Sequence, residues 1–174
     1  MKTIIKEENG LMTNDLVFAK VRPDAIIPTK EDENAGYDIY ACFDEDYMII
    51  PSHSTKLIPT GIASAMTDKY YLNVAERGST GSIGMKYSAG IVDSSYRGEI
   101  FIAICNANNM PIFISKTVDK VEKYDSAIYY PYKKAIAQLI VHEVPKMNVK
   151  EVTYDELLKI PSKRGIGALG SSGK

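Results

Sequence analysis

The sequence predicts an all-β domain, built as a sandwich, a jelly roll or a barrel. Proline and glycine recur at short intervals between Pro23 and Pro145, and these residues end regular elements and form turns. The segments between them are short and rich in β-branched and aromatic residues, which favour strands. With 174 residues, 45% hydrophobic and 25% charged, the chain suffices for one domain with a buried core.

The expected strands can be followed in chain order. Eight segments have strand composition: 16–21, 37–43, 47–50, 56–63, 70–75, 99–105, 112–114 and 135–141. Within the sixth of these, residues 100–105 are all apolar, which is typical of a strand covered on both faces. Residues 116–134 are charged and rich in tyrosine, and we expect them to form an excursion between strands.

One short helix is expected near the C-terminus. Thr153 and Glu156 have the spacing of a capping box, apolar residues follow, and Pro161 ends the helix. Beyond it, residues 162–174 contain four glycines and three serines, a composition that predicts a mobile tail. The expected organisation is therefore a polar N-terminal extension (1–14), a β domain (15–161) and a flexible tail (162–174).

Composition and missing motifs exclude several function classes. The net charge of −1 lacks the basic excess of a protein that coats nucleic acid. No apolar run approaches the roughly 20 residues that span a bilayer, and no signal-peptide core is present, so we expect a cytoplasmic protein without a membrane partner. The two cysteines and two histidines show no metal-ligand spacing. ATPase, dinucleotide-binding, zinc deaminase and serine hydrolase motifs are also absent.

Five clusters of glycine and polar residues remain as candidates for a site. They are 35–38 (AGYD), 77–81 (RGSTG), 90–98 (GIVDSSYRG), the glutamine of AIAQLI (135–140), and 164–173 (RGIGALGSSG). Arginine beside glycine and serine suits phosphate, because the guanidinium donates to two oxygens while glycine lets backbone N–H groups approach. Two such clusters, more than eighty residues apart, indicate a polyphosphate held from two sides.

Several of these residues also have structural interpretations. Asp38 and Asp93 are residue types that form turns, and Tyr96 could be an edge-strand aromatic. Gln138 has apolar neighbours in the sequence. A side-chain amide without hydrogen-bond partners is unfavourable in such surroundings, which favours a binding role for Gln138.

The order and wording of the five clusters resemble the trimeric dUTP pyrophosphatase (dUTPase) family. Residues 35–41, 77–81, 90–99, 135–140 and 164–173 are similar to the family's first to fifth motifs. The resemblance implies a distorted jelly-roll (β-clip) barrel and a homotrimer with active sites between subunits. It also implies Mg²⁺-dependent hydrolysis of dUTP to dUMP and pyrophosphate, which keeps uracil out of DNA and supplies dUMP for thymidylate synthesis.

The resemblance further implies roles for residues of the third motif. Asp93 would be the catalytic carboxylate, accepting a hydrogen bond from the sugar 3′-hydroxyl and orienting the attacking water toward the α-phosphorus. Tyr96 would lie against the deoxyribose and leave no room for a 2′-hydroxyl. Ala89, Gly90 and Ile91 would form the rim of a hairpin whose backbone reads the uracil edge.

The other motifs would hold the phosphates and the metal. Asp38 would reach Mg²⁺ through coordinated water, as that ion favours when phosphates supply its inner ligands. Leu169, on the tail, would shield the base. The implied phosphate-binding residues are Arg77, Gly78, Ser79, Gln138, Arg164, Gly170, Ser171 and Ser172.

The sequence departs from the family pattern in three places. The second motif usually reads Arg-Ser-Gly, so either the Ser79 hydroxyl or the Gly78 N–H would take the phosphate contact here. Ser95 stands where the family often has an acidic residue, and Ala135 stands where it often has an arginine. We hypothesise that the acidic residue and the arginine form an ion pair in relatives. Leu169 stands where the family has phenylalanine, and because leucine cannot stack on a base, weaker tail closure and a higher KM are expected.

Two alternative functions stay open on the sequence. A dCTP deaminase-like enzyme would need a glutamate base on the strand after the third motif, and Glu99 falls too early for it. A non-catalytic regulator could keep the nucleotide pocket and use residues 116–134 to bind a partner protein.

Overall fold

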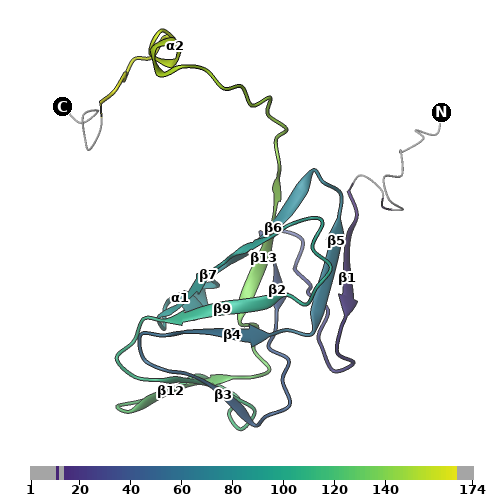
Figure 1. The fold of residues 1–174 in the computed structure, drawn as a ribbon. Helices are drawn as coiled ribbons and strands as arrows, with labels where there is room; N and C mark the ends of the chain where they lie inside the picture. Colours follow the sequence, from purple (N-terminus) through teal and green to yellow (C-terminus); the bar gives the residue numbers. More distant parts are fainter. Residues whose placement is uncertain (1–10, 12–13, 168–174) are drawn as a thin grey trace. The chain divides into compact units, whose positions relative to one another are not determined.

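The computed structural model describes residue 11 and residues 14–167 of the chain, and it confirms the all-β fold (Figure 1). These residues form thirteen strands and two short helices, one helix more than expected. The chain divides into two compact units, one that ends at Val144 and one that begins at Pro145. The domain boundary at residue 161 stays a prediction.

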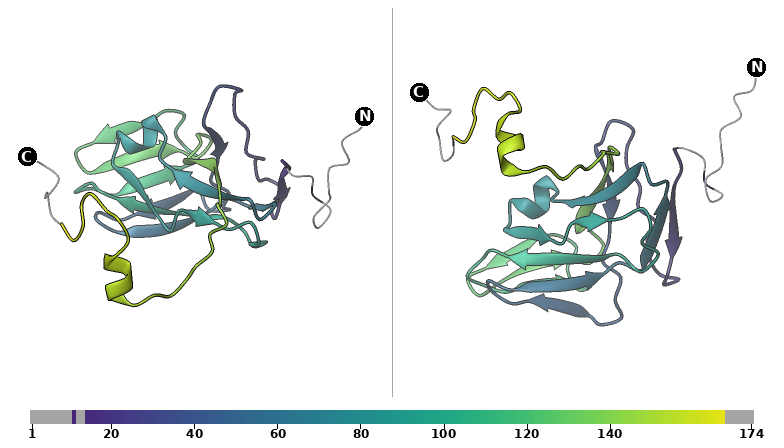
Figure 2. Two further views of the ribbon diagram at one scale, coloured as in Figure 1. Left: turned by 90° about the horizontal axis from the view of Figure 1, so that it is seen from above. Right: turned by 45° about the horizontal axis from the view of Figure 1, so that its top comes forward.

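The strands of the first unit form four small sheets (Figures 1 and 2). A pair consists of β1 (Leu16–Lys20) and β5 (Ile62–Met66). A three-stranded sheet has the order β4 (Thr55–Pro59), β9 (Phe101–Asn106), β7 (Met85–Ser88). One four-stranded sheet has the order β2 (Gly36–Ile39), β13 (Ala137–Glu143), β6 (Tyr70–Ala75), β8 (Ile91–Val92). The other has the order β11 (Glu122–Tyr124), β12 (Ala127–Pro131), β10 (Ile112–Ser115), β3 (Tyr47–Ile50).

Aliphatic side chains from these sheets meet in one core. In β9, Ile102 and Ile104 are fully buried, whereas Phe101 on the opposite face is 45% exposed. On the same face as Phe101, Ala103 is buried and Cys105 is half-buried. The expectation that this strand is covered on both faces therefore holds for Ala103 and fails at Phe101, where the single chain leaves the strand exposed.

The segment expected to form one strand over 56–63 is interrupted at Gly61. This glycine has a φ of +65°, and a Cβ placed on it would lie 2.8 Å from the Ala25 Cβ, so the turn favours a residue without a side chain. The chain leaves β4, which pairs with β9, and enters β5, which pairs with β1. The two halves of the predicted strand thus belong to different sheets.

Residues 116–134 contribute to the core, so their interpretation as an excursion between strands is wrong in its second half. Strand β12 pairs in parallel with β10, with Ile112 opposite Ile128. Ile128 and Tyr130 are buried, and the Tyr130 hydroxyl donates to the Ala135 carbonyl at 2.6 Å. The strand was not predicted because the residues before β12 are charged and the whole segment was interpreted by their composition.

The second unit contains the predicted helix, α2 (Tyr154–Leu158). Its capping box is confirmed: the Thr153 N–H donates to Glu156 Oε2 at 2.8 Å, and the Thr153 hydroxyl accepts from the Glu156 N–H at 3.3 Å. The bond from the Thr153 backbone lowers the pKa of Glu156. Among the described residues, no helix has the length and apolar character needed to cross a membrane.

Candidate active site

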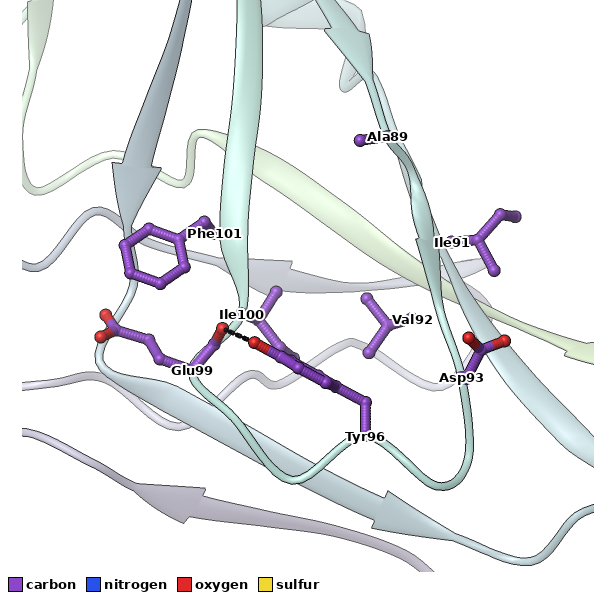
Figure 3. A pocket seen from close by; sticks show the side chains of 8 residues that line it. All are labelled: Ala89, Ile91, Val92, Asp93, Tyr96, Glu99, Ile100 and Phe101. Atoms are coloured by element: carbon purple, nitrogen blue, oxygen red, sulfur yellow. Dashed lines mark hydrogen bonds between the residues drawn. The ribbon is translucent and has the colours of Figure 1, made fainter.

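Two cavities in the first unit contain most of the residues singled out in the sequence. The first has a volume of about 230 Å³. Its walls carry apolar side chains, a tyrosine and two carboxylates (Figure 3): Ala89, Ile91, Val92, Asp93, Tyr96, Glu99, Ile100 and Phe101. Four predicted nucleoside-site or catalytic residues, Ala89, Ile91, Asp93 and Tyr96, are thereby brought together.

The second cavity, of about 360 Å³, is more polar. Asn34, Ala35, Gly36, Asp38, Arg77, Gly78, Ser79 and Gln138 line it, so residues of the first, second and fourth motifs meet there. The two cavities have no lining residue in common. On one chain, the predicted nucleoside and phosphate residues that line a cavity therefore line two different ones.

Asp93 follows β8 and is exposed on the wall of the first cavity. Its backbone carbonyl accepts from the Tyr96 N–H at 3.1 Å, which closes a turn. Among the described residues, no hydrogen bond engages its carboxylate. That carboxylate is available to a ligand or a water molecule in the cavity.

Tyr96 is held by the same turn. Its hydroxyl donates to the Glu99 carbonyl at 2.9 Å, and Figure 3 shows the ring reaching back across the loop toward that group. A Cβ on Gly98 would lie 2.4 Å from the Tyr96 hydroxyl oxygen. The ring can take this position because residue 98 has no side chain.

The connection Ala89–Gly90 differs from the expected hairpin. Strand β7 pairs with β9, whereas β8 pairs with β6, so the two strands that flank the connection belong to different sheets. Ala89 has a φ of +50°, and the Gly90 carbonyl accepts from the Val74 N–H at 2.7 Å. Gly90 packs against β6 and does not line the cavity, while its neighbours do.

Arg77 and Asp38 form a two-pronged ion pair in the second cavity. Arg77 Nε lies 2.8 Å from Asp38 Oδ1, and Nη2 lies 2.9 Å from Oδ2. Nη1 makes only a long contact of 3.5 Å with the Ala135 carbonyl. The guanidinium is held in one orientation with donors left for an anion.

Gln138 faces Asp38 across the β13–β2 pair. Its Nε2 donates to the Glu76 carbonyl at 2.7 Å, and its Oε1 lies 2.7 Å from where a Gly36 Cβ would be. The glycine of the first motif therefore leaves space for this amide beside the cavity.

The second motif forms the unexpected helix α1 (Gly78–Gly81). Gly78 is exposed, and a Cβ on it would meet nothing within 4 Å. The Ser79 hydroxyl oxygen is buried, and it has no hydrogen-bond partner in the part of the chain that the structure describes.

Of the fifth motif (164–173), only residues 164–167 belong to the part of the chain that the structure describes. Arg164 is exposed in the second unit, and its Nε donates to the Gly167 carbonyl at 2.8 Å. Leu169, Gly170, Ser171 and Ser172 lie outside the described residues.

Sequence reasoning missed four wall residues of the first cavity: Val92, Glu99, Ile100 and Phe101. Phe101 is an apolar wall residue at the exposed start of β9, and the uninterrupted apolar run over 100–105 gave no signal of its outward position. Glu99 ends the third motif, and the sequence suggests a catalytic role for it only in a deaminase. Its Oε1 instead accepts from the Gly61 N–H at 2.7 Å, a structural contact that argues against that role.

The residues present fit a magnesium ion only if substrate supplies most of its ligands. Within the described residues, no group of three or more His, Cys, Asp or Glu side chains could hold a metal. Both Asp38 oxygens already bind Arg77, which leaves this carboxylate suited to contacts through water. Mg²⁺ commonly keeps several waters and uses one carboxylate together with substrate phosphates.

Comparison with known proteins identifies the family. The dUTPase family model matches residues 22–121. This chain belongs to the dUTPase family. The deoxyuridine 5′-triphosphate nucleotidohydrolase of Candida albicans is 30% identical over 172 residues, which cover 98% of this chain and 95% of that protein.

Solved dUTPase structures share the fold. A mutant of the Staphylococcus bacteriophage 80alpha dUTPase with dUpNHpp gives a TM-score of 0.73 at 23% identity, covering 93% of this chain and all (100%) of that one. A mutant dUTPase from phage phi11 of S. aureus, whose structure shows the coordination of a structural Mg(II) ion, gives a TM-score of 0.64 at 19% identity, covering 82% of this chain and 99% of that one.

Proposed function

We propose that this protein hydrolyses dUTP to dUMP and pyrophosphate, with Asp93 directing a water molecule to the α-phosphorus. The observation that carries the proposal is the placement of Asp93 beside Tyr96 in one cavity, in a chain of the dUTPase family. The sugar and base would lie in this cavity against Tyr96, Ile91 and Phe101. The reaction would remove dUTP from the nucleotide pool and form dUMP for thymidylate synthesis.

Asp93 would act by positioning more than by basicity. The Asp93 carboxylate makes no hydrogen bond to residues 11 and 14–167 and can accept hydrogen bonds from the attacking water and from the 3′-hydroxyl of the sugar. Fixing the water in line with the leaving pyrophosphate supplies much of what phosphoryl transfer requires.

Arg77, Gln138 and the backbone of α1 would bind the phosphates in the second cavity. Asp38 would serve two purposes, holding the Arg77 guanidinium and contacting Mg²⁺ through water. The ion, when bound, would neutralise charge on the phosphate oxygens. Arg164, Gly170, Ser171 and Ser172 would add contacts from the tail, where Leu169 would cover the base.

The separation of the two cavities supports a site shared between copies of the chain. A nucleotide would contact Asp93 and Tyr96 of one copy and Arg77 and Gln138 of another. A homotrimer is the assembly we propose, with a cytoplasmic location. Sedimentation at equilibrium should give three times the chain mass.

Mixing two inactive variants tests the shared site directly. Asp93→Asn and Arg77→Ala chains, each inactive alone, should regain activity after they are unfolded and refolded together, because mixed assemblies contain intact sites. No recovery in such mixtures would contradict a site built from two copies.

The activity is tested with purified protein, Mg²⁺ and each deoxynucleoside triphosphate in turn. Pyrophosphate released from dUTP alone is expected. Ammonia from dCTP would indicate a deaminase, and binding without turnover would indicate a regulator. Asp93→Asn should lower turnover by orders of magnitude while dUTP binding is retained, and Asp125→Asn, an exposed carboxylate outside both cavities, should change neither.

A further inference from the structure

We propose that Glu99 is a positioning residue that fixes the Tyr96 ring and thereby sets the preference for deoxyribose over ribose. The proposal rests on the function above, in which Tyr96 lies against the sugar. In this proposal Glu99 contacts neither the reacting phosphate nor the attacking water. Its carbonyl holds the Tyr96 hydroxyl, and its side chain anchors the main chain that carries this carbonyl.

The Tyr96 ring depends on the loop that carries it. The ring is 45% exposed, and its hydroxyl is tied to the Glu99 carbonyl. The ring also lies over Gly98, where any side chain would displace it. Its position therefore follows the position of the Glu99 main chain.

That main chain is anchored to the turn between β4 and β5. Glu99 Oε1 accepts from the Gly61 N–H at 2.7 Å. One residue later, the Ile100 N–H donates to the Ile62 carbonyl at 2.7 Å, and the Ile100 carbonyl accepts from the Thr60 hydroxyl at 2.6 Å. Three bonds thus join two consecutive residues of the loop to three consecutive residues of the turn.

The turn is a firm support because its conformation is fixed by packing. Gly61 has a positive φ, and a Cβ built on it would lie 2.8 Å from the Ala25 Cβ and 3.0 Å from the Cys42 Sγ. Thr60 is almost fully buried. If Glu99 lost its carboxylate, the Gly61 N–H would lose its acceptor, and of the three bonds to the turn only the two made by Ile100 would be left.

Exclusion of a hydroxyl group by shape needs a wall that does not yield. A ring that is free to move away from the sugar would leave room for a 2′-hydroxyl. Loss of the anchor should therefore raise the relative use of ribonucleotides more than it lowers the use of dUTP.

The test compares kcat/KM for dUTP and for UTP in three variants. Glu99→Ala should lower the dUTP/UTP ratio by about tenfold, the value of one hydrogen bond. Glu99→Gln keeps an acceptor oxygen and should stay within about twofold of the parent ratio. Tyr96→Phe removes only the hydroxyl and should lower the ratio as Glu99→Ala does, and the double variant should lower it little further, because both changes act on one interaction.

Measurements of melting temperature and of product binding distinguish a positioning role of Glu99 from a merely structural one. A lower melting temperature of Glu99→Ala with an unchanged dUTP/UTP ratio would overturn the proposal, since Glu99 would then be merely structural. Calorimetric binding of dUMP and UMP reads the same preference without catalysis. A parent protein that binds dUMP selectively but lacks turnover would refute the proposed hydrolysis alone, whereas equal binding of dUMP and UMP would refute the positioning role.

Discussion

Replacing Gly78 with proline should reveal which group of the second motif binds phosphate. Gly78 is the first residue of α1, where an N–H has no partner within the helix. Proline is favoured at this position and requires an extended residue before it, and Arg77 has φ −89° and ψ 153°. The change therefore removes one N–H and leaves the backbone of the motif in place.

The expected magnitude follows from the chemistry of that bond. A hydrogen bond to a charged group contributes about 1.5–3 kcal/mol, which corresponds to a loss of about tenfold to about 150-fold in kcat/KM for dUTP. Gly78→Ala is the matched control, because an added Cβ meets nothing within 4 Å and the N–H is kept. Ser79→Ala should cost less, since the Ser79 hydroxyl is buried away from solvent.

Initial rates of pyrophosphate release at dUTP concentrations below KM measure kcat/KM for all three variants. The reasoning fails if Gly78→Pro keeps the parent value. It also fails if Ser79→Ala loses as much as Gly78→Pro, because the serine hydroxyl would then be the phosphate ligand.

Two further predictions concern stability and thiol chemistry. Tyr130→Phe removes the donor to a buried carbonyl and should lower the free energy of unfolding, measured in urea, by about 1–3 kcal/mol. The same change at the exposed Tyr124 should lower it by less than about 0.5 kcal/mol. Equal losses in the two variants would contradict this account. Hydrogen bonds from hydroxyls, that of Ser88 foremost, lower the pKa of Cys105, whereas burial raises the pKa of Cys42. At pH 8, a larger fraction of Cys105 than of Cys42 is therefore thiolate, and peptide mass spectrometry should show that iodoacetamide modifies Cys105 well before Cys42. The Ser88→Ala variant should be modified at Cys105 more slowly than the parent. Equal rates at the two cysteines would oppose the prediction.

Local patterns in the sequence determined the fold class, the family and several elements. Strands β3 and β6 have the bounds that composition predicts, and the capping box of α2 forms between the two residues that the spacing indicates. Such features depend on neighbours in the chain, so a linear pattern suffices to predict them. The five motifs are likewise short segments whose residue types can be read without coordinates.

Tertiary structure decided how these segments meet. Gly61 divides a continuous apolar segment between two sheets because its positive φ redirects the chain. Residues hidden in a charged segment supply the buried β12. The orientation of Arg77 by Asp38 and the anchoring of Glu99 at Gly61 join residues about forty positions apart. Contacts of this kind depend on strand pairing and close packing, which bring distant residues together and which no local pattern in the sequence specifies.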